Sequence, residues 1–267
     1  MGWGKATLLS LVIEFSLLVG ATVGISFLLR VAQPNESEFE LTMRLAEGGD
    51  TTAQWNLGVM YGNGEGVPQD DEEAVKWYTK AAEQGDVDAQ WNLGVMYDTG
   101  EGVPQDYKEA VKWYTKAAEQ GDVDAQNNLG NMYDTGEGVV QDYKEAFKWF
   151  TKAAEQGDVD AQYNLGDMYG KGEGVPQDYK EAVKWYTKAA EQGDVDSQYN
   201  LGLMYYNGEG VPKDLVQAYA WYDVAKANGQ EKAKEWRDKI ELTPLQLAEA
   251  QSLYTEIYKR IEANRQD

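Results

Sequence analysis

A stretch of 36 residues returns five times along this chain and constrains its fold more than any other feature. Residues 56–86 read NLGVMYGNGEGVPQDDEEAVKWYTKAAEQGD, and residues 92–122 repeat them with few changes. The glycine of the NLG triplet marks the period at Gly58, Gly94, Gly130, Gly166 and Gly202. A fixed period of this length indicates small units that bury their apolar faces only by stacking on their neighbours. The units are 51–86, 87–122, 123–158, 159–194 and 195–230.

The second unit shows what each copy is expected to build. Apolar residues fall at helical spacing in 87–97, and Gly94 inside that helix predicts a place where two helices touch closely. The joint GEGVPQD combines flexible glycines with a helix-blocking proline. Asp106 and Glu109 then form a capping-box pattern, in which each side chain would bond the backbone of the other. Gly121 stands where a helix is expected to end. One unit is therefore predicted to be one helical hairpin.

The repeated tryptophans, tyrosines and alanines are expected to form the core between hairpins. In the second unit the apolar stripe comprises Ala110, Trp113, Tyr114, Ala117 and Ala118. Large and small side chains at helical spacing suit interdigitated packing, and they do not indicate a cofactor site.

The pattern A-x-x-x-L-G-x-x-Y-x-x-G-x-G-V-x-x-D-x-x-x-A-x-x-W-Y-x-x-A-A-x-x-G resembles the Sel-one-like repeat, a relative of the tetratricopeptide repeat. The resemblance covers all of 51–230. It implies an all-α fold, a right-handed α-solenoid of five hairpins with helical caps, used as a scaffold for other proteins. Such arrays are common in signalling and in bacterial envelopes.

Both flanks of the array are expected to cap it. Residues 34–50 align with the second half of a unit and predict an N-terminal half-repeat cap. Residues 231–267 predict two C-terminal capping helices, the second with Thr243 as N-cap and Pro244 as its first residue. Its apolar face would comprise Leu247, Ala250, Leu253, Ile257 and Ile261. This last helix either only closes the core or also binds a partner.

Residues 1–33 differ from the rest. Between Lys5 and Arg30 lie 24 residues with one charge, Glu14, which is long enough to span a bilayer. We expect a transmembrane anchor in a bacterial inner membrane with a periplasmic repeat domain. The alternative is a signal whose cleavage would release a secreted protein. Gly20 and Gly24 form a G-x-x-x-G pattern that would allow two such helices to dimerise.

The composition excludes several function classes. A net charge of −22 disfavours nucleic acid and suits a partner with basic character. The chain has no histidine and no cysteine, so serine–histidine and cysteine–histidine catalysis and the usual zinc sites are excluded. None of its serines begins an S-x-x-K motif. We therefore expect no enzyme activity, cofactor or metal. A carboxylate-dependent hydrolase is the remaining enzymatic alternative.

A partner-binding surface is indicated by the few positions that differ between units. The fifth and ninth residues of each first helix vary while their neighbours stay constant, and residues four apart share one helix face. We call these ten residues the first-helix ridge: Trp55, Val59, Trp91, Val95, Asn127, Asn131, Tyr163, Asp167, Tyr199 and Leu203. In solenoids of this type the first helices line the concave surface, and exposed aromatic residues favour interfaces. The sequence predicts a membrane-anchored scaffold that binds a protein or peptide there, or alternatively a peptidoglycan- or glycan-binding envelope protein.

Overall fold

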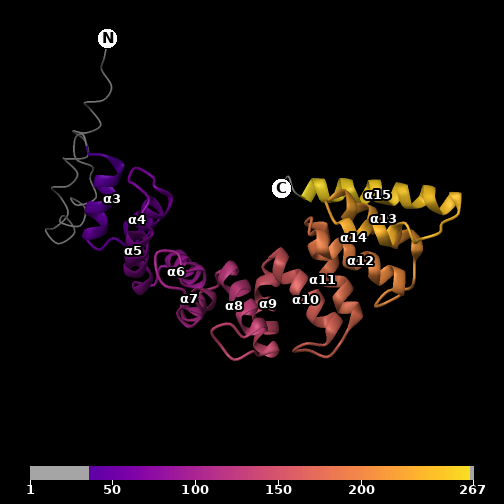
Figure 1. The fold of residues 1–267 in the computed structure, drawn as a ribbon, viewed down its shortest axis with the longest axis horizontal. Helices are drawn as coiled ribbons and strands as arrows, with labels where there is room; N and C mark the ends of the chain where they lie inside the picture. The colour runs from indigo at the N-terminus through magenta and orange to yellow at the C-terminus, as the bar shows by residue number, and fades with distance from the viewer. Residues whose placement is uncertain (1–35, 265–267) are drawn as a thin grey trace, which may run out of the picture. The chain divides into compact units, whose positions relative to one another are not determined.

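The computed structural model describes residues 36–264, and all regular secondary structure within that range is helical (Figure 1). The chain divides into two compact units. Unit 1 ends at Gln105 and unit 2 begins at Asp106. Unit 1 contains α3 (Glu38–Glu47), α4 (Thr51–Asn63), α5 (Asp71–Glu83) and α6 (Val87–Thr99).

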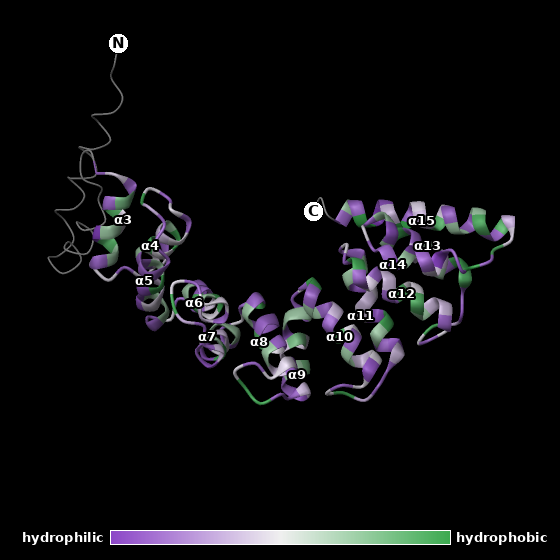
Figure 2. Cartoon of the chain, viewed as in Figure 1, coloured by the Kyte–Doolittle hydropathy of each residue, from purple (hydrophilic) through white to green (hydrophobic). Residues whose placement is uncertain are grey.

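Unit 2 contains the remaining helices. These are α7 (Tyr107–Glu119), α8 (Val123–Thr135), α9 (Tyr143–Glu155), α10 (Val159–Lys171), α11 (Tyr179–Glu191), α12 (Val195–Asn207), α13 (Leu215–Ala227), α14 (Glu231–Arg237) and α15 (Pro244–Asn264). The predicted hairpins are present as α4–α5 in unit 1 and as α8–α9, α10–α11 and α12–α13 in unit 2. Figure 2 shows hydrophilic and hydrophobic residues mixed along the helices, and the second helices α5, α7, α9 and α11 gather their hydrophobic residues on one face.

A Gly-Asp pair ends one helix and starts the next. After α9, Gly157 has φ +103°, the left-handed backbone that favours glycine at a helix end. The backbone N–H of Asp158 then donates to the carbonyl oxygen of Ala153 at 3.1 Å. The Asp158 carboxylate in turn accepts from the N–H of Ala161 at 2.7 Å, capping α10. The chain therefore reverses direction within two residues.

The capping box expected on the second helices is only half present. Asp106 accepts hydrogen bonds from the N–H groups of Lys108 and Glu109, as predicted. The Glu109 carboxylate pairs with Lys112 at 2.7 Å instead of returning to the cap. The prediction for the glutamate was wrong because the lysine one turn later offers its carboxylate a charged partner on the exposed helix surface.

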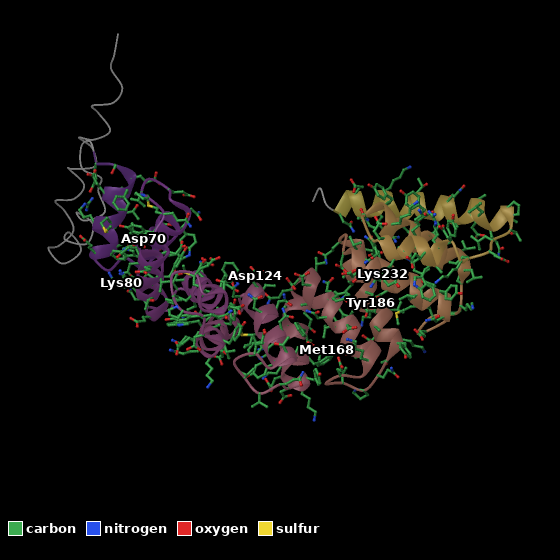
Figure 3. All side chains as sticks on the ribbon, in the orientation of Figure 1. Asp70, Lys80, Asp124, Met168, Tyr186 and Lys232 are labelled. Atoms are coloured by element: carbon green, nitrogen blue, oxygen red, sulfur yellow. The ribbon has the colours of Figure 1, made fainter. Side chains whose placement is uncertain are left out.

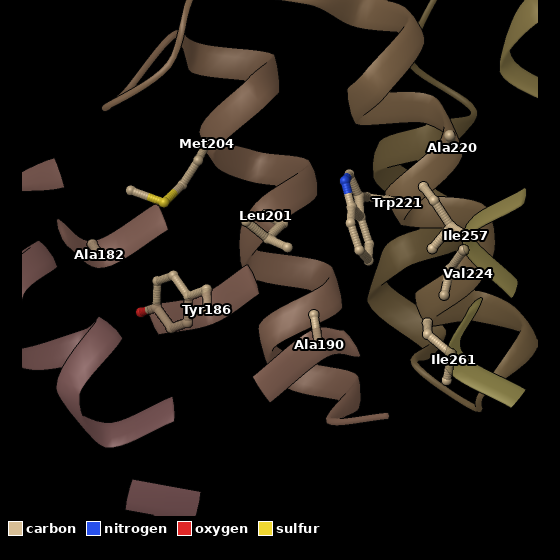
Figure 4. Close-up of a cluster of buried hydrophobic side chains, with 10 residues drawn as sticks. All are labelled: Ala182, Tyr186, Ala190, Leu201, Met204, Ala220, Trp221, Val224, Ile257 and Ile261. Carbon is tan, nitrogen blue, oxygen red and sulfur yellow. The ribbon is translucent and has the colours of Figure 1, made fainter. Parts of the chain in front are cut away.

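The predicted core residues are buried in every hairpin. In unit 2 one cluster contains Ala182, Tyr186, Leu201, Trp221 and Ile257 together with their neighbours. Figure 3 labels Tyr186 among the side chains of this unit, and Figure 4 shows Leu201 of α12 between Tyr186 of α11 and Trp221 of α13. The core therefore continues from each hairpin into the next, which is why a single copy could not fold alone.

The close helix contact predicted at the NLG glycine is confirmed. A Cβ atom built on Gly130 of α8 would lie 2.6 Å from Cδ1 of Phe150 on α9. The second glycine of the joint also has a packing role. Gly174 has φ +71°, and a Cβ there would collide with the carbonyl oxygen of Tyr143, at the start of the preceding second helix.

A ladder of buried glutamines, which the sequence analysis did not anticipate, joins the hairpins. Gln162 of α10 donates from Nε2 to the carbonyl oxygen of Ala154 at 3.2 Å. Its Oε1 accepts from Nε2 of Gln192 at 2.9 Å. Gln126 with Gln156, and Gln198 with Asn228, make the same bonds in unit 2. Each glutamine thus bonds a carbonyl oxygen at the end of the helix before it and the C-cap side chain of the helix after it.

Helices outside the repeats close both units. In unit 1, α3 packs on α4, and Gln54 donates to the Ala46 carbonyl oxygen at 3.0 Å as the ladder does elsewhere. In unit 2, α15 packs on α13 and α11. Its first turn is a capping box between Thr243 and Gln246. Its predicted apolar face is confirmed: Ala250, Ile257 and Ile261 are buried, and Leu247 and Leu253 are partly buried.

No helix within 36–264 has both the length and the apolar character needed to cross a membrane. The expected membrane span and its Gly20/Gly24 pair lie outside the described residues.

Candidate functional site: the first-helix ridge

In unit 1 the ridge residues lie on α4 and α6. Trp55, Val59, Trp91 and Val95 are all partly exposed. The indole Nε1 atoms of Trp55 and Trp91 are nevertheless buried and have no hydrogen-bond partner. These indoles are therefore donors whose hydrogen-bonding capacity is unused.

In unit 2 the ridge residues lie on α8, α10 and α12. Asn131 is exposed, and Tyr163, Asp167, Tyr199 and Leu203 are partly exposed. Asn127 is only 8% exposed and presents little surface in this conformation. Its Oδ1 atom is buried without a donor.

The ridge tyrosines rest on buried tyrosines of the second helices. The rings of Tyr163 and Tyr186 lie 5.9 Å apart with an interplanar angle of 50°. The rings of Tyr199 and Tyr222 repeat this arrangement at 5.8 Å and 46°. Aromatic pairs at such distances stabilise each other, so each exposed ring is held in place by the core. A rigid aromatic surface suits binding because little side-chain entropy remains to be lost.

The two tyrosines differ in their polar surroundings. Burial raises the pKa of Tyr199, a hydrogen bond from the Trp236 side chain lowers it, and the Glu235 carboxylate raises it. Burial raises the pKa of Tyr163, and the carboxylates of Asp167, Asp196 and Asp194 raise it further, while Lys171 acts in the opposite direction. Tyr163 therefore lies in a much more acidic environment than Tyr199.

The acidic environment continues onto α8 and the joint after α10. Lys171 Nζ lies 2.6 Å from Oδ2 of Asp167 and 4.0 Å from Oε2 of Glu173. Burial raises the pKa of Asp134, and Glu173 and Asp167 add to that effect against Lys171. One ammonium group thus pairs with two carboxylates, from α10 and the joint, and it also lowers the pKa of a third carboxyl group, Asp134 of α8.

The site residues predicted from the sequence do not include Asp134, Lys171, Glu173 and Asp196. A signal for them was present, because Asp167 is the only charged residue among the five equivalents at its position and Lys171 is the only lysine at its own. The sequence does not show which acidic residues of other helices lie beside this pair.

An asparagine next to the ridge varies in its bonding with the residue that faces it. Asn200 hydrogen-bonds the hydroxyl of Tyr186. At the equivalent place one repeat earlier, Phe150 has no hydroxyl, and Asn164 donates from Nδ2 to Oδ1 of Asn131 at 3.4 Å. The Asn164 amide thus connects α10 to the ridge residue Asn131 of α8.

The ridge shows no chemistry of its own. Within the described part of the chain, no three histidine, cysteine or acidic side chains are grouped to hold a metal ion. Two hollows lie elsewhere. One of about 440 Å³ is in unit 1 beside Phe39 and Met60, and one of about 310 Å³ is in unit 2 beside Tyr219 and Arg237.

Comparison with known proteins decides the family. The Sel1 repeat model matches residues 51–86, 87–122, 123–158, 159–194 and 195–230. The chain belongs to the Sel1 repeat family. Sel1 repeat proteins generally mediate protein–protein interaction and are typically non-enzymatic scaffolds.

Solved structures agree with this assignment of the Sel1 repeat chain. A protective antigen present in uropathogenic Escherichia coli strains, which displays an SLR fold, is 42% identical with a TM-score of 0.72. The match covers 81% of this chain and 48% of the antigen, so the chain spans about half of that protein. A Sel1 repeat protein from Oxalobacter formigenes is 34% identical with a TM-score of 0.69, over 82% of this chain and 95% of that one. Comparison with curated protein sequences gives no match.

Proposed function

We propose that this Sel1 repeat protein is a membrane-tethered scaffold that binds a protein or peptide partner over its first-helix ridge. The observation that supports it most is the pairing of each ridge tyrosine with a buried tyrosine, 5.9 Å apart for Tyr163 and Tyr186. An aromatic residue that is both exposed and rigid is the kind of anchor on which interfaces depend.

The test compares partner capture by chemical cross-linking in native membranes. The ridge variant is Trp55→Ala/Trp91→Ala/Tyr163→Ala/Tyr199→Ala. The control removes four partly exposed tyrosines that lie outside the ridge, as Tyr107→Ala/Tyr143→Ala/Tyr179→Ala/Tyr258→Ala. Both variants are first checked for helical content. We expect a defined protein to be captured by the wild type and the control and lost from the ridge variant. Equal capture by all three proteins would contradict binding at the ridge.

The alternative function, binding of peptidoglycan or another glycan, rests on the same aromatic residues. Stacking of aromatic rings on sugars would make the chain sediment with purified cell-wall material. We expect no such sedimentation. Sedimentation that the ridge variant loses would favour the glycan-binding protein over the scaffold.

The tether is proposed for residues 6–29, whose single charge is Glu14. We propose an inner-membrane protein with a periplasmic repeat domain, in which Gly20 and Gly24 allow helix dimerisation. Alkaline extraction should leave the protein in the membrane, with an intact N-terminus by mass spectrometry. Release of a shortened chain would indicate a cleaved signal and a secreted protein. Dimerisation that survives Gly20→Ile would exclude the G-x-x-x-G pair.

A further inference from the structure

The fourth repeat differs from the others at two positions on the ridge side of its first helix. The ninth residue of that helix is Asp167, where the other units have valine, asparagine or leucine. The thirteenth is Lys171, where the other units have asparagine or threonine. These two residues pair at 2.6 Å, so the one acid added to the ridge arrives together with its own counter-ion.

That counter-ion does not balance the charge around it. Burial raises the pKa of Asp134, the carboxylates of Glu173 and Asp167 raise it further, and Lys171 lowers it. The Lys171–Glu173 distance of 4.0 Å is at the limit of an ion pair. Asp167, Glu173 and Lys171 together carry a net negative charge, to which Asp134 adds, and this charge favours a second cation.

An aromatic ring lies beside the acids. Tyr163 is one helical turn before Asp167 on α10, and its ring is only partly covered by Tyr186. Asp196 of α12, which also raises the pKa of Tyr163, is exposed and already accepts from Nε2 of Gln230 at 2.7 Å. A ring face next to carboxylates is the environment that binds a guanidinium group, which stacks on the ring and donates to the acids.

A separate observation comes from α8. Asn127 is 92% buried, since 8% of it is exposed, and its Oδ1 atom has no donor. It shares a face of α8 with Asn131, whose Oδ1 contacts Asn164 on α10. Asn127 therefore lies on the side of α8 that borders α10. A buried acceptor without a donor is costly unless a partner supplies one.

We propose that Tyr163 and Asp167 form a binding site for an arginine side chain of the partner, an inference that rests on the scaffold function proposed above. The guanidinium stacks on the Tyr163 ring and donates to the Asp167 carboxylate, in competition with Lys171. The bound segment continues toward α8, where a rotation of the Asn127 side chain would bring its unpartnered Oδ1 atom to a backbone N–H of that segment. Arginine is favoured over lysine because its planar group both stacks on a ring and bonds a carboxylate through two N–H groups.

The test uses the full chain and two fluorescein-labelled peptides, one of repeated Gly-Ser-Arg and one of repeated Gly-Ser-Lys. Both carry the same charge, so the difference between their dissociation constants isolates the guanidinium group. Binding is followed by fluorescence anisotropy at neutral pH and moderate salt. We expect the arginine peptide to bind about five-fold more tightly.

Substitutions that should weaken or strengthen binding of the arginine peptide test the position of the arginine site. Tyr163→Leu and Asp167→Asn should each weaken binding of the arginine peptide about three- to ten-fold. Lys171→Thr, which installs the threonine found in the second and third units, should strengthen it because the internal competitor is gone. A purely structural role for these residues would not produce a gain.

Two controls match these changes. Tyr199→Leu removes the equivalent tyrosine, which has Trp236 and a single acid nearby, and Glu119→Gln removes one exposed charge from α7 of the same unit. Neither should change the preference for arginine. Equal binding of both peptides, or no gain with Lys171→Thr, would overturn the arginine site.

The same variants test the arginine site and the proposed scaffold function separately. A partner lost from the four-residue ridge variant but retained by Asp167→Asn and Tyr163→Leu would contradict the arginine site alone. A partner retained by every variant would contradict the ridge itself.

Discussion

Gly166 of α10 lies against the ring of Tyr186 of α11, so closely that a Cβ atom on Gly166 would come within 2.6 Å of Cδ1 of that ring. Gly58 with Tyr78, Gly130 with Phe150 and Gly202 with Tyr222 repeat this contact. The position of the ridge depends on it, because Tyr186 also supports the ring of Tyr163.

Gly166→Ala should therefore destabilise the fold, despite the better helix propensity of alanine. The extra methyl group must displace a buried aromatic ring, and we expect a loss of about 1–3 kcal/mol. Urea unfolding followed by circular dichroism measures it.

Gly170, one turn later in the same helix, provides the matched control. A Cβ there would meet only the Cβ of Ala182, at 4.0 Å. Gly170→Ala should stabilise the chain by about 0.5–1 kcal/mol through helix propensity. Similar effects from the two substitutions would show that the ring contact does not govern this position.

Gln162→Leu tests the glutamine ladder. It removes the bonds that Gln162 makes to the Ala154 carbonyl oxygen at 3.2 Å and to the Gln192 amide at 2.9 Å. Both groups keep a second partner, because the N–H and the carbonyl oxygen of Gly157 still bond them. We expect a loss of about 1–3 kcal/mol, since two hydrogen bonds are lost and each contributes about 0.5–1.5 kcal/mol. Gln177→Leu is the control, because Gln177 is exposed although it bonds the Gly170 carbonyl oxygen at 2.7 Å. A change of about 0.5 kcal/mol or less is expected there.

Ser197→Ala should stabilise the protein. Ser197 is fully buried in α12, its hydroxyl has no partner, and the other four units have alanine at this position. Removing an unsatisfied hydroxyl should yield about 1 kcal/mol. The reverse change, Ala161→Ser, should destabilise α10 by a similar amount. If Ser197→Ala destabilises the chain in thermal and urea unfolding, the hydroxyl has a partner that this conformation does not show.

Val140→Pro should also stabilise the protein, through the unfolded state. Val140 is 88% exposed in the joint after α8 and stands where the other four joints have proline. Gly138 and Gly174 have φ values of +72° and +71°, so the two joints share a backbone that accepts proline at this place. The expected gain is about 0.4–1 kcal/mol, with a matching loss for Pro176→Val. Opposite signs in urea midpoints would indicate a different backbone at residue 140.

Alkaline pH should unfold the chain through its buried tyrosines. Burial raises the pKa of Tyr78 to about 12 from an ordinary value of 10.0. A group whose folded pKa is raised contributes stability that is complete below pH 10 and is lost as the pH rises toward 12. The slope is about 1.4 kcal/mol per pH unit for one such group.

Tyr78→Phe should make the stability less dependent on pH in that window, because phenylalanine does not ionise. The third unit already has Phe150 at this position, so the ring alone suffices for packing. Stability is measured by urea unfolding at several pH values. An unchanged slope in the variant would mean that Tyr78 ionises as readily in the folded chain as in the unfolded one.

The repeat made most of the fold predictable. Hairpins, the close glycine contact and the alanine and tryptophan core all follow from residues that recur every 36 positions. Gln162 recurs in the same way, but no role was predicted for it. A polar residue next to a buried alanine in the sequence can be either buried or exposed to solvent. Glu109 was predicted to bond the backbone of the cap residue Asp106. Spacing alone does not show whether its carboxylate bonds that backbone or pairs with Lys112, because both are about one turn away.

The site was less accessible to prediction than the fold. The ridge follows from variation between units, and it includes Tyr163 and Asp167. Asp134 and Asp196 come from the preceding and following first helices, and their approach to these residues depends on how hairpins stack. Sequence spacing within one helix does not predict how neighbouring hairpins stack.

The glutamine ladder has a consequence for the length of the array. Its bonds join residues that are always 30 or 8 positions apart, as in Gln156 with Gln126 and Gln192 with Gln162. A whole unit could be inserted between two others, or removed, and every glutamine would again meet a carbonyl and an amide of the right kind. The protein can therefore grow or shrink in steps of one repeat without redesign of its interior, and the number of hairpins is adjustable to the size of what it binds.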